Sequence, residues 1–150
     1  MAQSLVKNYV HIIFSTKHRN DFIDNAVEKE LYSYISTICK DNDSPAIKIG
    51  GTENHIHILL TLSRKYAMMH VIQEIKAHSS RWIKTKGKKY ENFFWQDGYG
   101  AFSVSQKNVF ATINYIKNQK KHHQNEDFKD EFLTILKKYE TKYDEKYLWD

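Results

Sequence analysis

The sequence has little of what marks a secreted, membrane-bound or multidomain protein. Its 150 residues include one cysteine, one proline and five glycines. Because Cys39 is alone, no disulfide can form within the chain, and a cysteine-rich zinc site is excluded. No run approaches the roughly 20 apolar residues of a membrane span, and no basic segment followed by an apolar one opens the sequence. We therefore expect a cytoplasmic protein without a membrane partner.

The scarcity of proline and glycine also bears on domain organisation. The sequence has no repeat, no low-complexity tract and no linker rich in these residues. Apolar residues make up 41% and charged residues 27% of the chain, which is ordinary for a globular domain. The length suits one hydrophobic core. We predict a single domain that spans residues 1–150.

The charge balance is mildly basic. The chain has 23 Lys and Arg against 18 Asp and Glu, and 14% of its residues are aromatic. Cations hold phosphates and aromatic faces stack on bases, so this composition is compatible with a nucleic-acid partner. Composition alone does not decide between this partner and an ordinary solvated surface.

Hydrophobic periodicity predicts an α+β fold. Strands are predicted over residues 5–15, 46–50, 55–60, 93–96 and 99–104, and helices over residues 25–40, 68–86, 106–122 and 127–139. The order is a ferredoxin-like βαββαβ pattern with an antiparallel sheet, which leaves one face open. We expect helices packed on one face, then a helix that carries Tyr115, and then a further helix. The apolar tail around Trp149 is expected to dock on the domain.

Two histidines mark the third predicted strand. The segment enters through Gly50 and Gly51, which we expect to form a turn, and continues through His55 and His57. Side chains alternate along a strand that rises roughly 3.3 Å per residue, so the two imidazoles lie on one face about 6–7 Å apart. At that spacing they can bind one metal ion, although the same pattern also suits two solvated polar residues.

Two polar side chains share one face of the third predicted helix. Tyr115 and Gln119 are four residues apart, which places them one helical turn from each other. They lie off the apolar stripe that contains Ile113 and Ile116. Each alone is compatible with an ordinary surface position, so their significance depends on the motifs around them.

These motifs together resemble the HUH family, and within it the single-tyrosine transposases of the smallest bacterial insertion sequences. The matching segments extend over nearly the whole chain and in the same order. They are Phe14-Ser15-Thr16-Lys17 with Arg19, Gly50-Gly51 with His55-Ile56-His57, Lys76 with Ser79-Ser80-Arg81-Trp82, Trp95-Gln96-Asp97-Gly98-Tyr99-Gly100-Ala101-Phe102-Ser103-Val104-Ser105, Tyr115-Ile116 with Asn118-Gln119 and His122-His123, and Tyr147-Leu148-Trp149.

The resemblance implies an activity and a site. Tyr115 would attack a phosphodiester of single-stranded DNA, form a 5′-phosphotyrosine and leave a free 3′-hydroxyl. His55, His57 and Gln119 would hold a divalent cation, Mg²⁺ or Mn²⁺. The substrate would be an insertion-sequence end with subterminal hairpins. The protein would act as a homodimer, in which the tyrosine helix of one subunit can complete the site of the other in trans.

Elementary chemistry agrees with these roles. A phosphodiester is anionic and repels nucleophiles, and a cation on its non-bridging oxygen lowers that barrier. Tyrosine has a pKa of about 10 and needs activation at neutral pH. A covalent ester conserves the bond energy, so a second 3′-hydroxyl can rejoin the strands. Imidazole ligands by themselves favour Zn²⁺ or Mn²⁺, and Mg²⁺ comes only from the resemblance.

Further residues are candidates for DNA binding, and one residue departs from the family pattern. Basic and aromatic side chains that flank the sheet and the second predicted helix can form a phosphate track with stacking surfaces. Relatives often have an acidic residue just before the first histidine, where this chain has Asn54. The candidate DNA contacts are Lys17, Arg19, Lys76, Ser80, Arg81, Lys84, Trp95 and Tyr99.

Three other functions remain as alternatives. The first is a related HUH nickase, which the small size and the lack of a helicase domain disfavour. The second is a domesticated, non-mobile relative that only binds single-stranded nucleic acid, which the joint presence of Tyr115, both histidines and Gln119 disfavours. The third is a zinc hydrolase, which is disfavoured because no third histidine, cysteine or acidic ligand occurs at a matching spacing.

Overall fold

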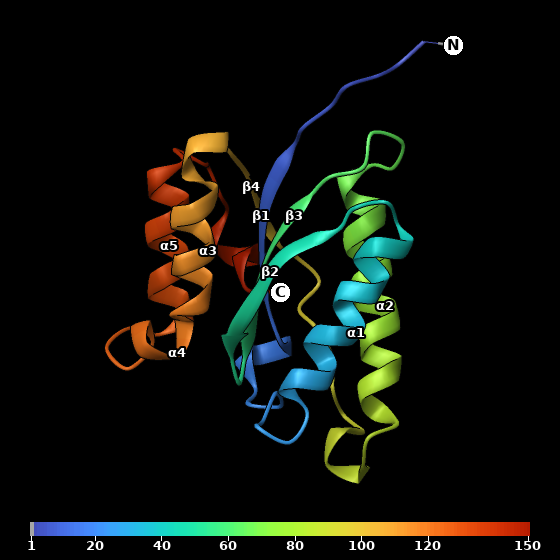
Figure 1. Ribbon diagram of the computed structural model, residues 1–150. Coiled ribbons are helices and arrows are strands. Elements are labelled where there is room, and N and C mark those ends of the chain that lie inside the picture. The colour runs from blue at the N-terminus through green and yellow to red at the C-terminus, as the bar shows by residue number, and fades with distance from the viewer. Residues whose placement is uncertain (1) are drawn as a thin grey trace.

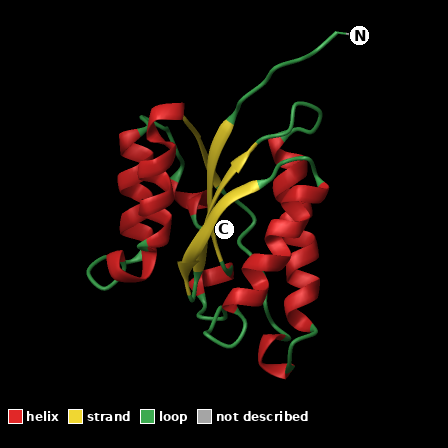
Figure 2. Cartoon of the chain, viewed as in Figure 1, coloured by secondary structure: helices red, strands yellow, loops and turns green. Residues whose placement is uncertain are grey.

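The computed structural model describes residues 2–150, and Met1, the first residue of the predicted domain, lies outside them. Four antiparallel strands form one sheet in the order β2-β3-β1-β4. This is the strand order of a ferredoxin-like fold, so the predicted fold is confirmed. Figures 1 and 2 show the twisted sheet in the middle of the molecule. The strands are β1 (Tyr9–Ser15), β2 (Ala46–Thr52), β3 (His55–Thr61) and β4 (Gly100–Val104).

Helices cover both faces of this sheet. In Figure 1, α1 and α2 lie on one side, while α3 and α5 lie on the other. The longer helices are α1 (Glu28–Asp41), α2 (Met68–Lys84), α3 (Val109–Lys117) and α5 (Phe128–Lys138). The short ones are η1 (Lys17–Arg19), η2 (Lys88–Tyr90), η3 (Gln106–Asn108), α4 (Gln119–His122) and α6 (Glu145–Leu148). The face that a ferredoxin-like sheet leaves open is therefore closed by the elements that follow β4.

Strand alternation distributes the apolar residues between the two faces of the sheet. Val10, Ile12 and Phe14 of β1 join the core under α1 and α2. Ile13 belongs to a second cluster, with aromatic residues of α5. The residues between these apolar ones point to the opposite face of the sheet. Since that face is covered too, its polar side chains are also buried. This includes the histidines of β1 and β3, which lie between the sheet and α3–α5.

The two glycines before the histidine strand do not form the predicted turn. They lie within β2, and the chain turns one step later, at Glu53 and Asn54. A Cβ on Gly50 would lie 2.6 Å from the carbonyl oxygen of Ile116 in α3. The glycine is therefore needed because the helix that carries Tyr115 packs directly on the backbone of β2.

Two other local predictions are wrong. Residues 93–96 form no strand, because the only pairing of this stretch is an isolated bridge between Thr16 and Trp95. The helix predicted over residues 106–122 is divided into η3, α3 and α4. It breaks at Asn118, where φ is −97° and ψ is 17°, between Tyr115 and Gln119.

The C-terminal tail docks as predicted. Trp149 packs against Phe128 and Phe132, and its carbonyl oxygen accepts a 2.9 Å hydrogen bond from Nη1 of Arg19. The carbonyl oxygen of Asp150 accepts a bond from the backbone N–H of Gly98. The tail thus joins α5 to the loops at the end of β1 and before β4. Within residues 2–150, no helix is both long and apolar enough to cross a membrane.

Candidate active site

The histidine strand supplies the first half of the site. His55 and His57 are fully buried, on the face of β3 that α3–α5 cover. Their ring centroids are 5.2 Å apart. His55 Nδ1 lies 2.9 Å from Asn54 Oδ1 and 3.0 Å from Thr52 Oγ1. Because an amide oxygen only accepts, the hydrogen bond to Asn54 uses a proton on Nδ1 of His55, and its Nε2 points into the site.

The tyrosine helix supplies the second half. Although the helix breaks at Asn118, Gln119 remains next to Tyr115 and is 1% exposed. Its Oε1 lies 2.9 Å from His55 Nε2, and its amide Nε2 donates a 2.9 Å bond to Glu131 Oε2. The structure therefore brings together all four predicted residues of the site, and it adds Glu131.

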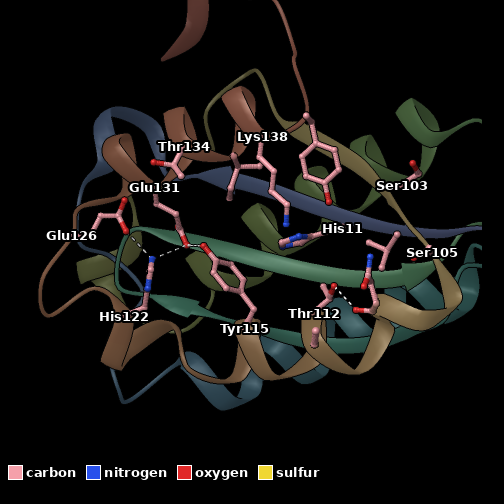
Figure 3. Close-up of a pocket in the computed structure, with 15 residues that line it drawn as sticks. His11, Ser103, Ser105, Thr112, Tyr115, His122, Glu126, Glu131, Thr134 and Lys138 are labelled. Atoms are coloured by element: carbon pink, nitrogen blue, oxygen red, sulfur yellow. Dashed lines mark hydrogen bonds and ion pairs between the residues drawn. The ribbon is translucent and has the colours of Figure 1, made fainter.

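Glu131 is the centre of this cluster, and sequence reasoning missed it. Its Oε2 accepts a short hydrogen bond from the Tyr115 hydroxyl, and Figure 3 shows the two side chains pointing toward one another from α5 and α3. Its Oε1 lies 3.2 Å from His57 Nε2, 3.5 Å from His55 Nε2 and 2.9 Å from His123 Nε2. No sequence spacing pointed to this carboxylate, because Glu131 comes from a separate helix, α5.

Burial and hydrogen bonding set the charges of these groups. Burial alone would raise the pKa of Glu131, but hydrogen bonds from His123, His55 and His57 lower it well below its usual range. Burial lowers the pKa of His57 to about 4. The pKa of Tyr115 is raised by burial and by its bond to the carboxylate. The site at neutral pH therefore holds an ionised Glu131, a neutral His57 and a protonated phenol.

This arrangement fits a divalent cation. His55 Nε2 and Gln119 Oε1, two atoms that can each ligate a metal, point into the site and lie 2.9 Å apart. One nitrogen from each of His55 and His57 and one oxygen of Glu131 lie within 4.8 Å of one another. Neighbouring ligands of an octahedral ion with bonds of 2.0–2.1 Å are about 3 Å apart. The ionised carboxylate of Glu131 supplies negative charge that would attract the cation. Burial lowers the pKa of His123, but its bond to the same carboxylate outweighs this and raises it.

A cavity of about 690 Å³ opens beside the Tyr115 hydroxyl, between β4, α3 and α5. His11 of β1 lies on its wall, with its Nε2 2.8 Å from His57 Nδ1. Burial, followed by the charge of the neighbouring His57, lowers the pKa of His11 to about 3, so it is a neutral imidazole. In Figure 3 the side chain of Lys138 reaches toward His11 from α5. The cavity gives a path from the surface to the phenol.

Two of the predicted DNA contacts are core or bracing residues. Trp95 is 6% exposed, and its indole N–H donates a 2.9 Å bond to Ser79, so the prediction that it offers a stacking surface is wrong. Lys76 Nζ lies 2.7–3.1 Å from the carbonyl oxygens of Gln96, Asp97 and Gly98. Its ammonium has all three donors occupied, which makes it a brace for this loop rather than a free cation for phosphate.

The other candidates remain at the surface, away from Tyr115. Arg81 is exposed on α2, across the sheet from the cavity. Lys84 donates to Ser80 and lies 4.1 Å from the ring centre of Phe94, which is 54% exposed. The remaining three lie just after the end of β1 and just before the start of β4. Lys17 pairs with Asp97, Arg19 donates to the carbonyl oxygen of Trp149, and Tyr99 is 40% exposed.

The sequence contains a signal for the two residues that sequence reasoning missed, Glu131 and His11. Phe128, Glu131, Phe132 and Ile135 recur at helical spacing, which puts a carboxylate on the buried stripe of α5. His11 alternates with Val10 and Ile12 in a strand that has apolar residues on both faces. A polar side chain at a buried position needs a hydrogen-bond partner. Glu131 and His11 could therefore have been identified from the sequence as candidates for the site.

The comparisons with known proteins agree on one family. The family model described as "Transposase IS200 like" matches residues 4–119. The ISDra2 transposase TnpA of Deinococcus radiodurans is 23% identical over 114 residues, which are 73% of this chain and 81% of that protein. A crystal structure of a putative transposase from Deinococcus radiodurans R1 superimposes with a TM-score of 0.62 at 20% identity, and covers 79% of this chain and 98% of its own. A REP-associated tyrosine transposase bound to a REP hairpin has a TM-score of 0.61 at 16% identity, over 82% and 73% of the two chains.

Proposed function

Since the chain belongs to the family of IS200-like transposases, we propose that it cleaves and rejoins single-stranded DNA at insertion-sequence ends through a 5′-phosphotyrosine at Tyr115. One observation carries this proposal. The Tyr115 hydroxyl and the two histidine Nε2 atoms contact the same buried carboxylate, that of Glu131. A nucleophile and a set of metal ligands are thus held around one point.

The metal site that we propose consists of His55, His57, Gln119 and Glu131, and it would hold Mg²⁺ or Mn²⁺. The oxygens of Gln119 and Glu131 make the donor set harder than two imidazoles alone, which favours these ions over Zn²⁺. When bound, the cation would polarise a non-bridging oxygen of the scissile phosphate. Asn54 orients His55 through a hydrogen bond. The side-chain N–H of Gln119 donates to Glu131, and this bond fixes the orientation of both side chains.

Tyr115 and Glu131 perform the covalent step in this proposal. Tyr115 Oη attacks the phosphorus while its proton passes to Glu131 Oε2, which already accepts it in a hydrogen bond. The bond from phosphorus to the 3′-oxygen breaks, and this oxygen takes a proton from water to become a free 3′-hydroxyl. In the joining step another 3′-hydroxyl gives its proton to the solvent hydroxide left by the first step, and its oxygen attacks the phosphorus of the phosphotyrosine. The bond from phosphorus to Oη then breaks, and Glu131 returns the proton to Tyr115.

The DNA partner and the assembly are part of the same proposal. A relative is bound to a REP hairpin, which supports subterminal DNA hairpins as the ligand of this chain. We place Arg81, Ser80 and Lys84 on the phosphates of such a hairpin, because they lie close together on α2, where Arg81 is exposed and the partly exposed Lys84 donates to Ser80. We further propose a cytoplasmic homodimer of one-domain chains, in which α3–α5 can serve the partner's histidine strand.

The experiment uses a single-stranded oligonucleotide from the element's end, labelled at its 3′ end, with Mg²⁺ or Mn²⁺. A 5′-phosphotyrosine leaves this label on the protein after denaturation, whereas a 5′ label departs with the free 3′-hydroxyl. We expect the adduct to be lost in Tyr115→Phe and reduced by EDTA or in His57→Ala. Tyr147→Phe is the matched control, because Tyr147 is 60% exposed and far from the cluster in sequence. An adduct that persists in Tyr115→Phe would rule out the proposed nucleophile.

A further inference from the structure

The pair formed by His11 and His57 has no assigned role in the reaction. His11 Nε2 lies 2.8 Å from His57 Nδ1, and the two side chains are 6% and 0% exposed. We propose that His11 is a positioning residue. When a cation occupies the site, the Nε2 of His11 accepts the Nδ1–H of His57, and this leaves the Nε2 of His57, which lies 3.2 Å from Glu131 Oε1 in this structure, unprotonated and aimed at the metal. This inference rests on the proposed function, because it concerns His57 as a metal ligand.

The sheet register explains how the contact is built. His57 of β3 pairs with Ile13 of β1, and His11 lies two residues from Ile13 on the same face. The two histidines are therefore diagonal neighbours, and their ring centroids are 5.1 Å apart. The strands fix the backbone of both residues, so this contact needs no loop to order itself. A ring held on both sides in this way has little freedom to rotate.

His57 needs a partner of this kind more than His55 does. His55 opens β3, so turn residues Thr52 and Asn54 reach its Nδ1. His57 lies inside the strand, away from the turn, and its Nδ1 bonds to a residue of the neighbouring strand β1. Among residues 2–150, the Nδ1 of His57 has no hydrogen-bond partner other than His11. Both histidines are thus oriented through Nδ1, the ring nitrogen that faces away from the metal site, one by an amide and the other by an imidazole.

An imidazole suits this buried position because it adds no charge. A carboxylate here would bring a second anion close to Glu131, and a lysine would add a cation beside the metal site. A neutral imidazole that accepts at Nε2 is protonated at Nδ1. His11 lines the cavity beside Tyr115, where water can take that proton in a hydrogen bond. The donors of both rings are then satisfied.

Two substitutions separate this role from simple packing. His11→Phe keeps a ring but removes the acceptor, whereas His11→Gln loses the ring but places an amide oxygen near the position of Nε2. His78→Phe on α2 is the control, because its ring is partly exposed and pairs with Glu74 and Arg81 on its own helix. The probe is Mn²⁺ alone, titrated into the full chain without DNA and followed by electron paramagnetic resonance. Thermal unfolding of each variant is measured in parallel.

We expect His11→Phe to weaken Mn²⁺ binding by about 10–100-fold, and His11→Gln and His78→Phe to stay close to wild type. In wild-type protein with saturating Mg²⁺, ¹⁵N spectra should show a coupling through the hydrogen bond, with the proton on His57 Nδ1. Normal Mn²⁺ affinity in a folded His11→Phe overturns the inference. If that variant does not fold, a proton found on His11 Nε2 in the Mg²⁺-saturated wild type overturns it. A wild type that binds Mn²⁺ without forming a DNA adduct refutes the proposed function instead.

Discussion

Asn54 Oδ1 lies 2.9 Å from His55 Nδ1 and accepts its proton in a hydrogen bond. The side chain of Asn54 also accepts a 3.1 Å bond from Thr52, which holds the amide in place at the turn between β2 and β3. The family resemblance leads one to expect an acidic residue at this position. The amide preserves the orientation of the histidine and leaves out the negative charge.

Substitution of Asn54 should therefore separate orientation from charge. Asn54→Asp keeps the acceptor and adds a charge near the metal site, so we expect Mn²⁺ to bind several-fold more tightly. Asn54→Leu removes the acceptor, and we expect binding to weaken about 10–100-fold. Isothermal titration of both variants with Mn²⁺ checks this. Equal affinities in the two variants would show that Asn54 does not orient His55.

Glu131 should be needed for DNA cleavage. Glu131→Gln keeps the shape of the side chain but removes both the charge and the proton acceptor for Tyr115. We expect the rate of adduct formation to fall on the order of 10²-fold or more. Glu126→Gln is the matched control, because Glu126 pairs with His122 at the edge of the cavity rather than with the two strand histidines. Similar rates in the two variants would remove Glu131 from the mechanism.

Gly50 should matter through the helix that packs on it. In Gly50→Ala the new Cβ would lie 2.6 Å from the Ile116 carbonyl oxygen and 2.9 Å from its Cγ2. Helix α3 must then shift, and Tyr115 with it. A displacement of about 1 Å can cost on the order of 10²-fold in rate. Gly98→Ala is the control, since its Cβ would meet nothing closer than 3.7 Å. We expect this control to retain wild-type adduct formation, and an equally active Gly50→Ala would contradict the argument.

Lys76 should contribute to stability more than to DNA affinity. Lys76→Met leaves three carbonyl oxygens without their charged donor, and hydrogen bonds to charged groups contribute about 2 kcal/mol. In a chain of this size we expect the melting temperature to fall by about 5 °C. Lys88→Met at an exposed position is the control. Binding of a hairpin oligonucleotide at low temperature should hardly change in Lys76→Met, whereas Arg81→Ala should weaken it. The reverse pattern would restore Lys76 as a DNA contact.

The arrangement of the homodimer can be tested by mixing two inactive proteins. Tyr115→Phe retains the histidines, and His57→Ala retains the tyrosine. If α3–α5 serve the partner subunit, a mixed dimer contains one site with both intact halves, so we expect adduct formation to return on mixing. Light scattering measures the oligomeric state in the same samples. A dimer in which mixing restores no activity would show that Tyr115 works only within its own chain.

Sequence periodicity and the family resemblance together predicted the sheet and most of the site. Period two in β3 placed His55 and His57 on one face, and the four-residue spacing placed Gln119 beside Tyr115. Both relations hold in the structure because each depends only on residues that are close in the sequence. Even the break at Asn118 keeps the two helix residues adjacent, since it changes the helix by only part of a turn.

The features that the sequence did not predict are set by contacts between segments that are distant in the sequence. Glu131 reaches the histidines from another helix, and no local pattern specifies that α5 lies over β3. Trp95 and Lys76 looked like surface residues because an aromatic and a basic side chain suit DNA. Their burial follows from the loop at residues 95–98, whose carbonyl groups bond to Lys76 instead of extending the sheet. Glycines that resembled a turn instead allow a helix to pack closely.

The docked tail has a practical consequence for these assays. The carbonyl oxygens of Trp149 and Asp150 bond to Arg19 and Gly98, beside the loop that contains Lys17. A purification tag fused after Asp150 would begin next to candidate DNA contacts and would pull on α5 through Trp149. The segment before β1 extends away from the sheet in Figure 1. Affinity tags and fluorophores for the binding experiments are therefore best attached at the N-terminus.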